Sequence, residues 1–152
     1  MTRSDDQELS AAIQKADSPA WADRAAAGRQ LAVSDRIEDL ADVIHRLLLD
    51  PQDTAVIQET AEALLERKDT IGLRHVLLAC SRATTDDAVD HLGAALDCDP
   101  EWMTTEGADR LIKQLNELAT DEDAGVRDEA RQILARLRPR VEWARDSSLA
   151  EP

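Results

Sequence analysis

Residues 50–69, DPQDTAVIQETAEALLERKD, carry an apolar spacing that fits one face of an α-helix. If Ile57 is taken as the first position, Ala61 lies four residues on, and Leu64 and Leu65 lie seven and eight residues on. These offsets follow the 3.6-residue period of the α-helix. The Asp-Pro start indicates the N-terminal end of this helix, because acidic residues are favoured there. The segment therefore predicts an amphipathic helix with one buried stripe.

The same offsets recur at three other places in the chain, which indicates an internal repeat. They give Leu92, Ala95 and Leu96 after Ala88, and Ala130, Ile133 and Leu134 after Val126. After Trp21 only Ala25 fits, because Gly28 and Arg29 occupy the later positions. The four first positions, residues 21, 57, 88 and 126, are 36, 31 and 38 residues apart. The chain is therefore predicted to repeat one structural unit at an irregular period.

A second amphipathic segment follows each of the first three repeats. These segments are residues 35–49, 69–83 and 105–119. A single pair of helices cannot bury its apolar stripe alone, so neighbouring pairs are expected to stack and share one continuous core. The sequence thus predicts a succession of helical hairpins.

Composition favours the same all-α fold. The 152 residues include no Tyr, no Phe and three Trp, so the core must consist of Ala, Leu, Ile and Val. Aromatic residues that favour strands are scarce, whereas strong helix formers dominate. The cysteines, Cys80 and Cys98, form no CxxC pair, and we expect two unpaired thiols. No targeting segment or long apolar run is evident, so a cytoplasmic protein is predicted.

The repeated segments resemble the HEAT-repeat family of α-solenoids. Residues 126–134, VRDEARQIL, match its pattern of a hydrophobe followed by Arg, then Ala and a hydrophobic pair. Residues 50–69 match next best, although Gln58 replaces the usual Arg. The resemblance covers residues 17–138 and implies a right-handed α–α superhelix, HEAT-like or armadillo-like, of about four hairpins with capping helices. Arrays of this family are typically non-enzymatic binding surfaces, and the resemblance implies that here.

One domain over residues 1–152 is expected from this arrangement. Residues 4–16 would form an N-terminal cap helix, followed by repeat units at 17–49, 50–83, 84–118 and 119–138. Pro139 is expected to end the last repeat helix, because proline lacks the N–H that the helix interior requires. Residues 139–152 would then hold a short cap helix, covering the core through Val141 and Trp143, and a flexible tail.

The charge of the chain bears on its partners. The formal net charge is −14, and such a surface repels both nucleic-acid phosphates and anionic membranes. The acids are also unevenly placed, since residues 84–118 contain nine acids and two bases. The expected partner is therefore another protein with a basic surface, with no nucleic acid and no membrane.

The loop at residues 97–105, DCDPEWMTT, lies within this acidic segment and offers two interpretations. Trp102 among carboxylates is typical of an interface hot spot, where the indole anchors and the acids steer a basic partner. Alternatively, Trp102 folds back onto the helix pair and the acids are simply solvated. The predicted contact residues are Trp102, Asp99, Glu101, Glu106 and Asp109, with Glu38 and Asp42 on a second helix as weaker candidates.

No pattern in the sequence indicates catalysis, a metal site or a cofactor. The histidines, His45, His75 and His91, have no ligand-type residue three or four positions further along the chain, and the glycines form no phosphate-binding loop. We therefore predict a non-enzymatic protein-interaction scaffold. A more specific alternative is an inhibitor or immunity protein that neutralises a basic toxin or nuclease, as small acidic bacterial proteins do.

Overall fold

The computed structural model describes the backbone of residues 3–150 and the side chains of residues 6–137. Within that range the chain is helical without strands, which confirms the predicted all-α class. The α-helices are α1 (Arg3–Lys15), α2 (Trp21–Ala32), α3 (Ala41–Leu48), α4 (Thr54–Glu66), α5 (Thr70–Arg82), α6 (Asp86–Asp97), α7 (Thr105–Leu118) and α8 (Ala124–Ala150). Two short 3-10 helices, η1 (Ile37–Leu40) and η2 (Pro100–Met103), precede α3 and α7.

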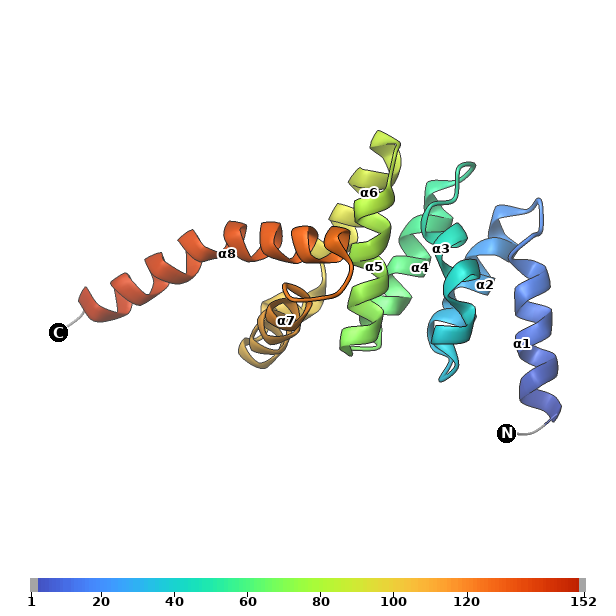
Figure 1. Ribbon diagram of the computed structural model, residues 1–152, viewed down its shortest axis with the longest axis horizontal. Helices are drawn as coiled ribbons and strands as arrows, with labels where there is room; N and C mark the ends of the chain where they lie inside the picture. The colour runs from blue at the N-terminus through green and yellow to red at the C-terminus, as the bar shows by residue number, and fades with distance from the viewer. Residues whose placement is uncertain (1–2, 151–152) are drawn as a thin grey trace.

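The helices follow one another along the long axis of the molecule, with the two termini at opposite ends (Figure 1). Helix α2 packs on α4, and α4 packs on α6. Helices α3, α5 and α7 form a second set, in which α5 contacts both of the others. Helix α8 packs mainly on α5 and α7, and α1 covers α2 at the other end.

The start of each of the later three repeat helices is fixed by the side chain that the sequence places there. Asp53 accepts a hydrogen bond from the backbone N–H of Ala55, Thr85 from that of Ala88, and Asp123 from that of Val126. Such caps satisfy backbone donors that have no partner within the helix. The acidic and hydroxyl residues before the later three repeats therefore act as caps.

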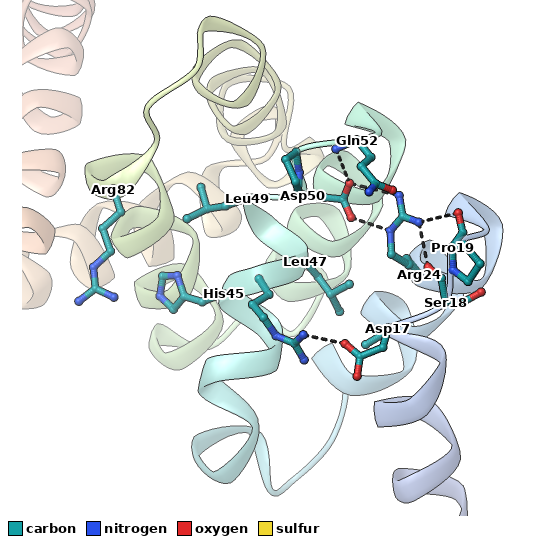
Figure 2. Close-up of a pocket in the computed structure, with 13 residues that line it drawn as sticks. Asp17, Ser18, Pro19, Arg24, His45, Leu47, Leu49, Asp50, Gln52 and Arg82 are labelled. Atoms are coloured by element: carbon teal, nitrogen blue, oxygen red, sulfur yellow. Dashed lines mark hydrogen bonds and ion pairs between the residues drawn. The ribbon is translucent and has the colours of Figure 1, made fainter.

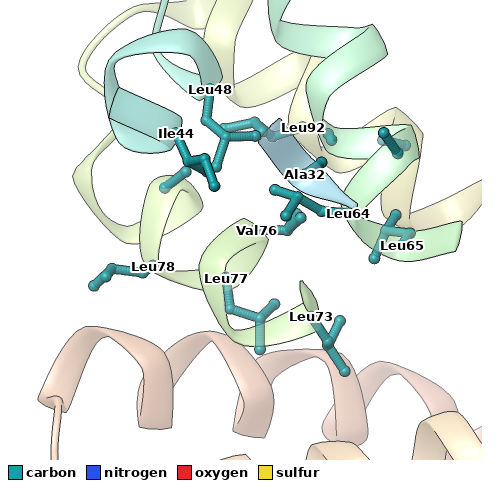
Figure 3. Packing of buried hydrophobic residues seen from close by; sticks show 14 of the residues in the cluster. Ala32, Ile44, Leu48, Leu64, Leu65, Leu73, Val76, Leu77, Leu78 and Leu92 are labelled. Carbon is teal, nitrogen blue, oxygen red and sulfur yellow. The ribbon is translucent and has the colours of Figure 1, made fainter. Parts of the chain in front are cut away.

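The core is aliphatic, as the missing aromatics require. Ile44 and Leu48 of α3 lie close to Leu64 of α4 and to Val76 of α5 (Figure 3). At the predicted first positions Ile57, Ala88 and Val126 are all buried. Each of these helices therefore buries the predicted stripe.

Trp21 is wrong as the first position of its repeat, because its side chain is 51% exposed. Helix α2 buries the face that begins three residues later, at Arg24, and the same offsets then give Gly28, Leu31 and Ala32, all buried. Apolar spacing in the sequence does not indicate this register, because its first buried position is occupied by the polar residue Arg24. Gly28 is needed there because a Cβ atom at this position would overlap the side chain of Thr60 on α4.

Pro139 does not end the last helix, since α8 continues from Ala124 to Ala150. The expected short cap helix and the tail up to residue 150 are therefore parts of α8. A proline in a helix interior removes one backbone hydrogen bond, and it can bend a helix instead of ending it. Figure 1 shows that α8 bends along its length and extends beyond the other helices. The expected role of Val141 and Trp143 lies outside the described side chains.

Candidate functional site

The acidic loop of residues 97–105 is an ordered 3-10 turn. Asp99 accepts a hydrogen bond from the backbone N–H of Glu101, and Pro100 occupies the first position of η2. Thr104 in turn caps α7 by accepting from the N–H of Gly107. The sequence therefore fixes both ends of the turn, and η2 holds Trp102 in a defined place between α6 and α7.

Trp102 is half-buried against the aliphatic core. Its indole Nε1–H donates a hydrogen bond of 2.9 Å to the carbonyl oxygen of Leu96, at the end of α6. The side chain therefore folds back onto the helix pair, as the second interpretation of the loop expects. Because its only polar group is already bonded, Trp102 can offer a partner only an apolar ring surface.

Glu101 bridges two cations of the same chain. Its carboxylate lies 3.2 Å from Nζ of Lys68, in the α4–α5 turn, and 2.9 Å from Nη2 of Arg110 on α7. Hydrogen bonds from Arg110 and then Lys68 lower the pKa of Glu101. Glu101 therefore ties three elements together, and its charge is neutralised within the molecule.

The other predicted acids are less constrained. Burial is the main reason that the pKa of Asp99 is raised. Glu106 and Asp109 are exposed on the first turns of α7, and neither forms an ion pair with a residue whose side chain is described. Asp97, at the end of α6, is also exposed. The carboxylates of Asp97, Glu106 and Asp109 are therefore available to a partner near Trp102.

A groove of about 540 Å³ lies beside Trp102. Its walls come from α5, α6, η2, α7 and α8, and its apolar lining residues are Leu73, Leu96, Trp102, Ala108, Leu111, Ile112, Leu115, Ile133 and Leu137. Its charged residues are Asp97, Asp99 and Arg136. Apolar grooves of this size with a few polar groups are typical of binding sites. We call this feature the Trp102 groove.

Glu38 and Asp42 do not join this site. They are exposed on η1 and α3, and α5 lies between α3 and α7 (Figure 1). The predicted contact residues therefore divide into one group around Trp102 and a separate pair on α3.

Sequence reasoning missed a set of arginines that hold the inter-helix connections. Arg24 forms a buried ion pair with Asp50 at 2.7 Å, and its Nη1 donates to the carbonyl oxygens of Ser18 and Pro19. Arg127 donates in the same way to the carbonyls of Asp121 and Glu122. The signal was present in the sequence, because Asp50 and Asp121 each open the connection before a repeat helix.

A pair of histidines, His45 half-buried and His75 buried, forms a second unexpected feature. The rings of His45 on α3 and His75 on α5 meet edge to face, with centroids 6.3 Å apart. Both ring nitrogens of His45 and Nδ1 of His75 are buried and have no hydrogen-bond partner in the described chain. Burial is the largest cause that lowers the pKa of each histidine. Both imidazoles are therefore neutral at pH 7.

The two cysteines differ in their surroundings. Cys80 is half-buried, and burial raises its pKa to about 12, whereas Cys98 is exposed. Both thiols are free. Because the thiolate is the nucleophile, a pKa raised this far leaves Cys80 unreactive.

Among the described residues, no three or more His, Cys, Asp and Glu side chains form a cluster that could hold a metal ion. Nor does any helix in that part of the chain have the length and apolar character needed to cross a bilayer. Comparison with protein-family models, curated proteins and solved structures finds no match to this chain. The Trp102 groove and its surroundings are therefore the candidate functional site.

Proposed function

We propose that the chain is a non-enzymatic protein-binding module, built as a short HEAT-like solenoid, that holds a basic segment of a partner protein in the Trp102 groove. The two sets of helices, α2, α4 and α6 and then α3, α5 and α7, support the solenoid interpretation. Helix α8 departs from a regular succession because it packs on α5 and α7.

The observation that carries the proposal is the apolar wall of the Trp102 groove, formed by nine side chains from five elements. A partner side chain in this groove would lose contact with water, which is the main source of binding free energy. Leucine-like side chains fit such a wall, and the fixed ring of Trp102 costs little conformational entropy on binding.

The charges around the groove indicate which polar side chains the bound segment carries. Asp97 lines the groove, and Glu106 and Asp109 lie on the first turns of the neighbouring α7. The whole chain carries a formal charge of −14, so a basic segment would be attracted from a distance. The occupant is therefore an amphipathic segment that combines leucine-like and lysine-like side chains.

The experiment is a binding titration with a synthetic amphipathic helix of leucine and lysine. We expect Asp97→Lys to weaken binding by about tenfold, because it places a like charge on the groove wall. Asp90→Lys is the matched control, since Asp90 is exposed on the same helix, outside the groove, and the change of charge is equal. Equal affinity of the two variants would reject the Trp102 groove as the binding site.

A further inference from the structure

A second groove, of about 700 Å³, lies where the α1–α2 and α3–α4 connections approach the C-terminal end of α5 (Figure 2). Leu49, Pro19 and Pro51 provide apolar surface, whereas Leu47 lies buried beneath them. Its volume suits a ligand of a few residues or a small molecule. We call it the Arg82 groove, after the cation that α5 contributes at its end.

The groove differs from the rest of this acidic chain in the charges that line it. Three arginines face two aspartates there. Both aspartates are already occupied. Asp50 accepts hydrogen bonds from Arg24 and from the N–H groups of Gln52 and Asp53, and Asp17 pairs with Arg46 at 2.7 Å.

Two groups that line the groove, Arg82 and His45, have no hydrogen-bond or ion-pair partner among the described side chains. Arg82 is exposed and forms no ion pair with a residue whose side chain is described. His45 lines the same groove, and neither of its ring nitrogens has a partner in the described chain. A guanidinium donates hydrogen bonds in a planar fork that matches a carboxylate. Because the ring nitrogens of His45 are buried, Arg82 is the group that calls for a ligand with an anionic acceptor.

We propose that the Arg82 groove binds an acidic–aliphatic peptide segment of a partner protein, with its carboxylate on Arg82 and its aliphatic side chain on Leu49. The occupant thus has the opposite charge to the one expected at the Trp102 groove. Leu73 in the Trp102 groove and Arg82 lie near opposite ends of α5, so the two grooves do not overlap.

His45 provides a local reporter of an occupied groove. Burial is the first cause that lowers its pKa, and the positive charge of Arg82 is the second. A carboxylate bound to Arg82 would offset that second cause and raise the pKa of His45. Asp42, His75 and Arg74 also act on this ring, and none of them lines the groove.

The test is an NMR titration of the full chain with the blocked peptide Ac-Leu-Glu-Leu-NH2. The Glu peptide should give saturable shifts at the His45 ring and at the Leu49 methyl groups, and should raise the pKa of His45. Ac-Leu-Gln-Leu-NH2 should bind at least about tenfold more weakly, because it lacks the charge that pairs with Arg82.

Variants separate this site from general attraction of anions. Arg82→Gln should weaken binding of the Glu peptide about tenfold, whereas Arg131→Gln, at an exposed arginine on α8, should leave it unchanged. Equal affinity for the Glu and Gln peptides, or no response of His45, would overturn the proposal. Butyrate binding as tightly as the peptide would overturn the peptide assignment. Asp97→Lys lies outside this groove, so failure here is distinct from failure at the Trp102 groove.

Discussion

At the scale of single residues, one buried ion pair holds two connections of the fold in place. Arg24 and Asp50 keep only 8% and 5% of their side-chain surface exposed. Burial alone would raise the pKa of Asp50, but hydrogen bonds from Arg24, Gln52 and Asp53 outweigh it and lower that pKa. The pair contributes order as well as charge, because Arg24 also bonds two loop carbonyls.

Arg24→Met should therefore lower the free energy of unfolding by about 3–5 kcal/mol, since it leaves the buried Asp50 carboxylate without its cation. Arg46→Met is the control. It breaks the exposed pair with Asp17, with 58% and 63% of the two side chains exposed, and should cost less than about 1 kcal/mol. Urea unfolding of both variants gives the comparison. Similar losses would show that the burial of the Arg24 pair is unimportant.

The His45–His75 pair predicts a loss of stability in mild acid. Each histidine has a lowered pKa in the folded chain, so the unfolded chain binds protons first as the pH falls below about 6.5. The unfolding free energy should then decline by at most about 1.4 kcal/mol per pH unit for each histidine, and level off below the folded pKa. The charged groups that act on the pair are Asp42, Arg74 and Arg82 at His45, and Glu38, Arg67, Asp69 and Arg74 at His75.

Denaturant unfolding between pH 5 and pH 8 measures this decline. His75→Leu replaces the buried imidazole with an aliphatic side chain and so removes one of the two protonation sites. The variant should show a shallower dependence on pH. A wild-type stability that does not change between pH 7 and pH 5 would contradict the prediction.

At the scale of helices, the close crossing of α2 and α4 depends on Gly28. A Cβ atom there would overlap Thr60, so Gly28→Ala forces the two helices apart. We expect a loss of about 1–3 kcal/mol, as for other overpacked core positions. Gly93→Ala on α6 is the matched control, because a Cβ atom there meets nothing within 4 Å. It should stabilise the chain by about 0.5–1 kcal/mol, and thermal unfolding distinguishes the two. Equal effects would argue against the close crossing.

Most helices could be predicted because residues close together in the sequence determine where they form. Apolar spacing places α4, α5, α6 and α7 within a few residues of their observed bounds, and Asp53 and Thr85 cap helices as their position suggests. The register of α2 and the end of α8 could not be predicted. An arginine occupies the first buried position of α2, and Pro139 lies inside a helix that local rules would end.

The candidate site shows the same division. The acidic turn and its Trp were evident from the sequence, but the bond from Trp102 to Leu96 and the two cations on Glu101 depend on helices brought together by folding. The Trp102 groove itself combines residues from positions 73 to 137, so spacing along the chain could not reveal it.

At the scale of the whole molecule, the helical array separates two grooves of different character. The Trp102 groove is apolar beside exposed acids, and the Arg82 groove carries one arginine, Arg82, without an ion pair to a described side chain. If both bind as proposed, the chain joins a basic segment and an acidic segment of its partners. A rigid row of helices is suited to that role, because it fixes the distance between two binding sites.

The most direct test of this account is a chemical-shift map of the full chain with the leucine–lysine helix, recorded at low and moderate salt. We expect shifts at Trp102, Leu111 and Ile112 at both salt concentrations, with affinity falling as salt rises because the attraction of opposite charges is screened. Shifts spread over the acidic surface and absent from these three residues would contradict the account.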